Sequence, residues 1–278
     1  MDHRFIAQAI SCSTESVADR QRLKRLVDPS ICYADPAGGG APSDGAILNF
    51  ALNLEYLEAE FYLRATTGSG LPDEMTTGVG TRGEVSGGGS VNFSSNLVRK
   101  FAREIASDEM EHVAFLRSAL GSAAVARPTI SLDTSFTAAA TAAGLIKQGE
   151  SFDPYANDLN FLFAAFLFED VGVTAFKGSA ALLSNKTYLD AAAGLLATEA
   201  YHAGIVRSAL YNAGIADDAV FRGVQKISDA RNSLDGPTDD DQGIGTAEEA
   251  NFIPTDDNGM CYGRSAGAIL NIVYLNPN

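Results

Sequence analysis

Apolar residues recur every three or four positions along several stretches of the chain, which is the spacing of one face of an α-helix. The stretch 48–62 shows this pattern clearly and contains no glycine or proline. We predict a helix that begins at Ser43 or Asp44, either of which can cap its N-terminus, and that runs to about Thr67. A second stretch, 159–171, is apolar nearly all round and predicts a buried helix.

The rest of the pattern predicts further helices and the connections between them. Helices are expected at about 94–120, 155–183, 186–212 and 217–233, with a short alanine-rich helix near 136–146. The glycine-rich stretch 68–91 is expected to be a loop, and Ser184-Asn185 a turn. A connection of about 35 residues separates the second long helix from the third, which is long enough to cross a bundle.

These elements predict an all-α protein built on a four-helix bundle with a long crossover and a fifth helix. We divide the chain into an irregular N-terminal segment (1–43), the helical bundle (44–233) and a C-terminal tail (234–278). The tail is rich in Asp, Gly and Pro, and its apolar stretch 266–275 is expected to dock on the bundle. The run Asp239-Asp240-Asp241 could bind calcium, although a solvated turn is the more common role for such a run.

Two short motifs carry the chemistry. Glu109 to His112 and Glu199 to His202 both read Glu-x-x-His, and together they use two of the three histidines of the chain. On a helix, residues three apart lie on one face, so each motif places a carboxylate beside an imidazole. Two such faces, with one glutamate from each of two other helices, are the known ligand pattern of dinuclear carboxylate sites in helical bundles.

Each Glu-x-x-His motif follows a helix that can supply one further carboxylate ligand. Glu55 lies on the face of Leu48, Leu52 and Tyr62, whereas Glu58 shares only part of that face and Glu60 points elsewhere. Glu169 interrupts the buried helix, where a carboxylate is costly unless it is paired or metal-bound. Asp170 is the alternative ligand there, 100° away around the helix.

We therefore predict six metal ligands: Glu55, Glu109, His112, Glu169, Glu199 and His202. Four carboxylates balance two divalent ions, and oxygen-rich ligands with two nitrogens suit iron or manganese better than structural zinc. Glu109 and Glu199 are the expected bridging ligands. A lone Glu-x-x-His is more often a surface ion pair than a ligand pair, so the prediction depends on the complete set.

Tyr62 is a candidate catalytic residue. It follows Glu55 by seven residues, two turns along the same helical face, so it can approach a metal or bond to a ligand. A core tyrosine with no chemical role explains the spacing equally well. The phenylalanines at 161, 163, 166 and 168 could keep water from the site, and a plain core explains them equally.

The helices resemble the ferritin-like superfamily, on the string Asn53-Leu54-Glu55 with Tyr62 seven residues later. More narrowly, the chain resembles the plant desiccation-related proteins. The segments that carry this likeness are 48–62, 101–116, 234–244 and the ending 251–274, within a likeness that covers roughly residues 40–275. The resemblance implies a ferritin-like bundle and a secreted, cell-wall or organellar protein. It implies a link to water stress and no particular reaction.

Composition and net charge limit the classes of partner that we expect. The net charge is −15 over 278 residues, which argues against nucleic acid and anionic membrane surfaces as partners. The apolar run 159–168 is too short to span a membrane, and no clear signal peptide is visible. The expected partner is a small-molecule oxidant or substrate, and a homodimer is an open hypothesis. Of Cys12, Cys32 and Cys261, we expect Cys32 and Cys261 as the pair if a disulfide forms.

Three functions compete on this basis. The first is a redox enzyme that activates dioxygen or dismutes peroxide at a di-iron or di-manganese centre. Manganese catalases do not repeat Glu-x-x-His so symmetrically on the fourth helix, which weakens the catalase form of this hypothesis. The second is iron oxidation and storage, which requires a shell that the terminal segments would hinder. The third is a stress-protection or structural protein in which the metal only stabilises the fold.

Overall fold

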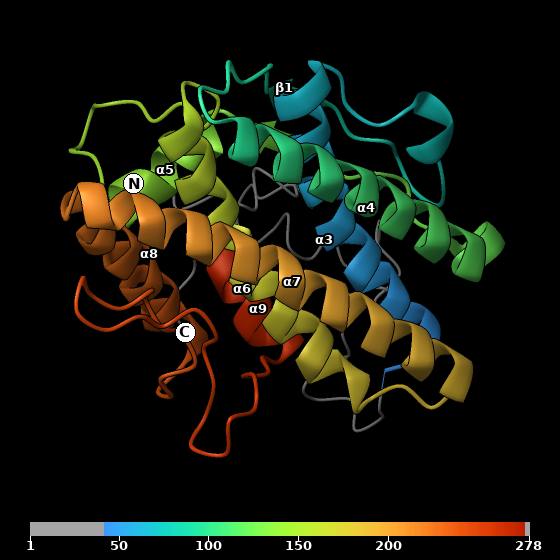
Figure 1. Ribbon diagram of the computed structural model, residues 1–278. Coiled ribbons are helices and arrows are strands. Elements are labelled where there is room, and N and C mark those ends of the chain that lie inside the picture. Colours follow the sequence, from blue (N-terminus) through green and yellow to red (C-terminus); the bar gives the residue numbers. More distant parts are fainter. Residues whose placement is uncertain (1–41, 276–278) are drawn as a thin grey trace.

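Four long helices form the framework of the protein. The computed structural model describes residues 42–275. The bundle consists of α3 (Asp44–Thr67), α4 (Asn96–Leu120), α6 (Asp158–Ala180) and α7 (Lys186–Ala216). Helix α3 packs mainly on α4, and α6 packs mainly on α7 (Figure 1). The two pairs meet through contacts of α3 with α6 and of α4 with α7. The predicted four-helix bundle is confirmed.

The helices begin where polar side chains cap them. A side-chain oxygen of the N-cap residue accepts a hydrogen bond from a first-turn amide in each of the four helices; the caps are Ser43, Ser95, Asn157 and Asn185. Such caps satisfy amides that have no partner inside the helix. The predicted starts at 44, 94, 155 and 186 lie within three residues of the observed ones. Helix α7 continues to Ala216, four residues beyond its predicted end at 212.

Two matching aspartate contacts join the helix pairs. Asp44, at the start of α3, accepts hydrogen bonds from the amides of Ser184 (2.8 Å) and Asn185 (2.9 Å), just before α7. Asp158, at the start of α6, accepts from the amides of Ser94 (2.9 Å) and Ser95 (2.7 Å), just before α4. Each half of the bundle therefore fixes the N-terminus of the other half's Glu-x-x-His helix.

The connections contain more regular structure than the sequence pattern indicates. The segment 68–91, predicted to be a loop, is mostly irregular but contains the 3-10 turn η1 (Asp73–Met75) and strand β1 (Val85–Gly87). Strand β1 pairs in parallel with β2 (Ile130–Leu132), which lies in the crossover beyond η2 (Gly121–Ala123). The short crossover helix α5 spans Thr134–Ala142, close to the predicted 136–146.

A buried ion pair joins the connecting segments that contain β1 and β2 to helix α3 of the bundle. Glu60 is fully buried and its carboxylate pairs with Arg127, in the crossover, and with Arg64 (3.0 Å). Arg127 also donates to the carbonyl of Gly83 (2.7 Å). Glu60 therefore points away from the other acids of α3, as the sequence pattern predicts.

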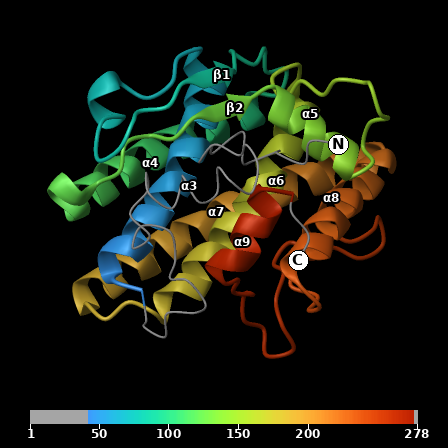
Figure 2. The same ribbon diagram turned by 180° about the vertical axis from the view of Figure 1, so that it is seen from behind.

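The C-terminal tail packs on the second helix pair. Helix α8 (Ala219–Asp235) contacts α7 and α6, and α9 (Ala266–Val273) contacts α8 and α6. Figure 2 shows α9 lying across the side of the bundle opposite to α4 and α7. Ile269, Ile272 and Val273 of α9 are buried there.

Helix α6 is the most apolar element of the framework. It is the one described helix that is long and apolar enough to cross a membrane, yet 83% of its apolar window is buried inside the protein. It also carries Glu169 and Asp170 at its centre. A bundle core explains its composition, because a core helix is apolar on all sides.

Some predictions fall outside the described residues. Cys12 and Cys32 lie there, as does nearly all of the N-terminal segment 1–43, so the proposed Cys32–Cys261 pair stays a prediction. Cys261 is half-buried in the C-terminal tail. The boundaries at 43 and 233 likewise stay predictions.

Candidate metal centre

The six predicted ligands converge at the centre of the bundle. They form two overlapping groups whose ligand atoms lie within 4.8 Å of one another. The first group is Glu55, Glu109, His112 and Glu199, and the second is Glu109, Glu169 and His202. One residue comes from α3, one from α6 and two from each of α4 and α7. All six are buried.

Each histidine contacts carboxylates from other helices. The Nδ1 atom of His112 lies 3.2 Å from Glu55, 3.4 Å from Glu109 and 3.4 Å from Glu199. The Nδ1 atom of His202 lies 2.9 Å from Glu109. It also lies 4.0 Å from Glu169. The two imidazole rings stack with centroids 6.1 Å apart.

Glu109 is the residue that the two groups share. Its Oε1 atom faces His202 and its Oε2 atom faces His112. This is the placement expected of a bridging carboxylate. Glu199, the other predicted bridge, belongs to the first group. The bridging roles themselves stay predictions.

Many polar atoms of this cluster have no hydrogen-bond partner within the protein. Seven buried carboxylate oxygens have no hydrogen-bond partner: Glu55 Oε1, Glu58 Oε2, Glu109 Oε1, Glu109 Oε2, Glu169 Oε2, Glu199 Oε1 and Glu199 Oε2. The Nδ1 atom of His202 also has none. Buried polar groups without partners are costly, and metal coordination would satisfy them. The donor set is oxygen-rich with two nitrogens, so the residues present fit iron or manganese.

Burial and charge repulsion shape the protonation of the cluster. Burial raises the pKa of Glu55, Glu58, Glu169 and Glu199, and the charges of neighbouring glutamates add to it. Burial acts in the same direction on Glu109, but its closeness to the two histidines outweighs it and lowers its pKa.

The pKa values of both histidines are raised, against the effect of burial. Burial disfavours the charged imidazolium of His202, yet its close contact with Glu109 and the charges of Glu169 and Glu109 raise its pKa to about 10. The pKa of His112 is also raised, because its closeness to the carboxylates of Glu109, Glu199 and Glu55 outweighs the effect of burial. Without metal, these shifts favour the protonated form of both histidines beside the carboxylates.

Metal binding is consequently expected to release protons. Each imidazolium must lose its proton to bind a metal ion, so loading two ions at pH 7 should release at least two protons per chain. Because these protons are held until high pH, the apparent affinity for metal should rise with pH between pH 6 and about 10. Calorimetric titration in buffers of different ionisation enthalpy measures the number of protons released per chain. Loading without proton release would show that the histidines are not ligands.

Tyr62 lies beside the cluster. Its hydroxyl donates a hydrogen bond to Glu169, and its ring packs edge-on against Phe168, with centroids 5.9 Å apart. Burial and the charge of Glu169 raise the pKa of Tyr62, which keeps the hydroxyl protonated. The structure thus places Tyr62 next to a predicted ligand, and its catalytic role stays a prediction.

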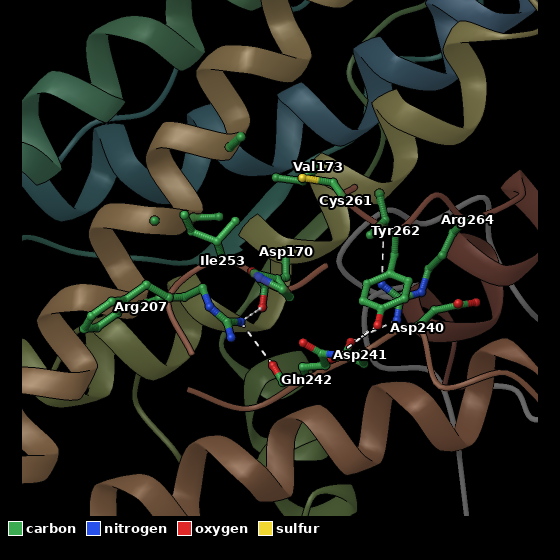
Figure 3. Close-up of a pocket in the computed structure, with 16 residues that line it drawn as sticks. Asp170, Val173, Arg207, Asp240, Asp241, Gln242, Ile253, Cys261, Tyr262 and Arg264 are labelled. Carbon is green, nitrogen blue, oxygen red and sulfur yellow. Dashed lines mark hydrogen bonds and ion pairs between the residues drawn. The ribbon is translucent and has the colours of Figure 1, made fainter. Parts of the chain in front are cut away.

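Glu169 and Asp170, the two candidate ligands of α6, point in different directions. Asp170 turns away from the cluster and pairs with Arg207 (2.7 Å) and Arg231 (3.1 Å). Figure 3 shows Arg207 reaching both Asp170 and the backbone of Gln242. Glu169 is therefore the acid of α6 that faces the other glutamates.

The acidic run of the tail is part of this arginine network. Asp241 is buried and pairs with Arg231 (2.7 Å) and Arg264 (3.0 Å), and Arg264 also pairs with Asp235 (2.6 Å). Two arginines beside Asp241 are unfavourable for a cation, so this network does not support the calcium alternative for the run 239–241. The small pocket in Figure 3 lies against this network and outside the acid cluster.

Two residues near the site are not among the predicted ligands. Asp108, which is 43% exposed in its side chain, contacts Nε2 of His202 at 3.1 Å. Glu58 is 3% exposed and lies close enough to feel the charges of Glu199, Glu109, Glu55 and Glu169. Its spacing of three residues from Glu55 was a usable signal for this position. Asp108 resembled any surface acid next to a ligand, and only the packing of α4 on α7 reveals its partner.

Asp108 is expected to orient His202. A carboxylate that accepts from the second imidazole nitrogen fixes the tautomer and the ring of a metal-binding histidine. Replacing Asp108 with asparagine should weaken binding of one of the two ions by roughly 10–100-fold and leave the other unchanged. Competition with a chromophoric chelator measures both affinities. Equal loss of both ions, or of neither, would contradict this role, and the exposed Glu104→Gln on the same helix is the control.

Comparisons with known proteins identify the family of the chain. The ferritin-like domain family matches residues 43–212 of the chain. Desiccation-related protein PCC13-62 of Craterostigma plantagineum is 33% identical over 200 residues, which are 69% of this chain. The matched part is 62% of that protein, so the chain covers less than two thirds of it. Ferritin-like catalase Nec2 of Nesocodon mauritianus is 25% identical over 270 residues, 89% of this chain and 86% of that protein. No solved structure matches the chain closely enough to count as a relative.

Proposed function

Because the chain belongs to the ferritin-like domain family, we propose that it is a dinuclear iron or manganese protein that acts on a small oxidant, with hydrogen peroxide as the favoured substrate. The observation that carries the proposal is the buried cluster of four glutamates and two histidines with seven nearby carboxylate oxygens lacking partners. Similarity to a ferritin-like catalase over 89% of the chain supports the choice of peroxide. This similarity strengthens the catalase hypothesis, which the symmetrical Glu-x-x-His repeat had weakened.

The proposed reaction consumes two peroxides. One peroxide loses two electrons and two protons to give dioxygen, and the second takes up two electrons and two protons to give two waters. A bound pair of metal ions would hold the two electrons between these half-reactions. In this scheme Glu55, Glu109, Glu169, Glu199 and the two histidines hold the ions.

The surrounding residues have supporting roles in this proposal. Tyr62 orients Glu169 through its hydrogen bond, and Asp108 orients His202. Phe168 and Phe161 pack against the ring of Tyr62 and exclude bulk water from this side of the cluster. Exclusion of water strengthens the electrostatic interactions inside the site.

A second candidate is a stress-protection protein whose metal only stabilises the fold. Similarity to a desiccation-related protein favours it, since that name records a stress and no reaction. Metal that binds only the folded state adds stability by mass action, about 2.7 kcal/mol at a concentration 100 times Kd. Both candidates use the same site and differ in turnover.

The test begins with metal content. Protein purified without chelators, or loaded anaerobically with iron or with manganese, should hold two ions per chain and release one dioxygen for every two peroxides. His112→Ala and His202→Ala should each lose one ion and the activity while the bundle stays helical. Two ions without turnover, with a raised Tm, would favour the stabilising role. No metal under any loading condition would refute the dinuclear centre.

A further inference from the structure

The two halves of the bundle repeat position by position around the cluster. Eleven residues separate Asp44 from Glu55, and eleven separate Asp158 from Glu169. Fourteen residues separate the cap Ser95 from Glu109, and fourteen separate the cap Asn185 from Glu199. A residue at a given distance from Glu55 on α3 therefore has a counterpart at the same distance from Glu169 on α6.

This repeat breaks at one position of the cluster. Three residues after Glu55 the chain has Glu58, whereas three residues after Glu169 it has Gly172. A Cβ atom added to Gly172 would lie 3.0 Å from Glu199 Oε2 and 3.3 Å from Glu58 Oε1. The glycine therefore leaves room beside both carboxylates that alanine would largely fill.

A small apolar cavity opens on this room from the seam between α3 and α6. Glu58 and Gly172 line it on the side of the cluster, and its apolar wall consists of Leu54, Leu57, Leu167, Phe168, Val171 and Val273. Its volume is about 10 Å³, enough for roughly one water-sized molecule. Val273 belongs to α9, so this helix, which lies beside α6 in Figure 2, forms part of the wall.

Glu58 is the polar group of this cavity that lacks a partner. It is 3% exposed, and its Oε2 atom has no hydrogen-bond partner. The four glutamates of the predicted ligand set already balance two divalent ions, so Glu58 is not needed for charge balance. A buried carboxylate kept at such a position is available to a small molecule that can donate a hydrogen bond.

We propose that hydrogen peroxide meets the metal centre at this cavity, and that Glu58 accepts a hydrogen bond from it there. The inference rests on the proposed dinuclear centre. The apolar walls favour a neutral molecule, because an ion would lose its hydration without compensation on that side. The cavity holds about one water-sized molecule, so only a ligand of about two heavy atoms that lies partly in the room beside Gly172 is small enough to bind.

The test uses nitric oxide as a neutral diatomic probe. Protein loaded anaerobically with two ferrous ions is titrated with nitric oxide and followed by its absorption and electron paramagnetic resonance. Gly172→Ala should weaken nitric oxide binding on the order of tenfold, because the added methyl group fills the room beside Glu58. Gly194→Ala on α7 is the matched control, since a Cβ there has nothing within 4 Å.

Two further variants keep the inference decidable. Val273→Ala enlarges the cavity from α9, away from the acids, and should accelerate nitric oxide binding severalfold. Glu58→Gln keeps the shape, and should leave two ions bound while lowering the affinity for hydrogen peroxide measured as KM. If Gly172→Ala disturbs metal binding through Glu199, the Val273→Ala and Glu58→Gln variants still test whether the cavity binds the oxidant.

The outcomes separate the two proposals. If the wild-type protein binds no metal, the proposed function falls and the inference falls with it. If it binds two ions and turns over peroxide, but nitric oxide binding is the same in Val273→Ala and Gly172→Ala as in wild type, only the inference is overturned. Loss of an ion in Glu58→Gln would also overturn it, by showing that Glu58 holds metal and not substrate.

Discussion

Glu109→Gln is expected to remove both metal ions, whereas each histidine variant removes one. Glu109 is the residue common to both ligand groups, with one carboxylate oxygen facing each histidine. Changes in residues that only orient a ligand cost 10–100-fold in affinity, so loss of this shared ligand should cost more than about 100-fold for both ions. The measurements are metal content per chain and the metal-dependent rise in Tm, and both should vanish.

Glu111→Gln provides the control for this prediction. Glu111 lies on the same helix two residues further on, but its side chain is exposed. The same substitution there should leave two ions bound. If Glu109→Gln keeps one ion at wild-type affinity, Glu109 serves a single metal and the two groups are not bridged by it.

The bundle could be predicted because its signals are local. Apolar spacing and polar caps locate α3, α4, α6 and α7, since each signal lies within the helix it predicts. The pairing of β1 with β2 joins residues 45 positions apart through three residues each, Val85 with Ile130 among them. Strands of three residues have no readable period, so the sequence pattern could not indicate them.

The candidate site divides in the same way. The sequence could bring together Glu109 with His112 and Glu199 with His202, because Glu-x-x-His is a motif within one helix turn; their role as ligands stays a prediction. The choice of Glu169 over Asp170 could not be made from α6 alone, because it depends on Arg207 and Arg231, which lie 37 and 61 residues further along the chain. The contact of Asp108 with His202 likewise joins α4 to α7.

The internal repeat of the two halves also includes one arginine in each half. Arg207 follows His202 by five residues and bonds Asp170, the residue after Glu169. Arg117 follows His112 by five residues and bonds the hydroxyl of Tyr56 (2.6 Å), the residue after Glu55. Each arginine also binds backbone carbonyls of a covering segment, at Thr77 and at Gly243. The repeat therefore extends beyond the ligands to the groups that hold the covering segments.

Arg231→Met is expected to destabilise the protein by about 3–5 kcal/mol, the usual cost of removing one partner from a buried charge network. The network contains three arginines and three aspartates: Arg207, Arg231, Arg264, Asp170, Asp235 and Asp241. Arg231 is 1% exposed, and it also donates to the carbonyls of Phe166 and Leu167. Its removal leaves a negative charge buried and frees two carbonyls of α6. Denaturant unfolding measures the loss.

The same helix supplies the control for this variant, and a second change tests its cause. Arg222 on α8 is exposed and pairs with exposed Asp218, so Arg222→Met should cost less than about 1 kcal/mol. Adding Asp241→Leu to Arg231→Met restores charge balance, because Asp170 keeps Arg207 and Asp235 keeps Arg264. The double variant should therefore recover part of the lost stability. If Arg231→Met costs no more than Arg222→Met, the network does not hold the C-terminal tail to the bundle.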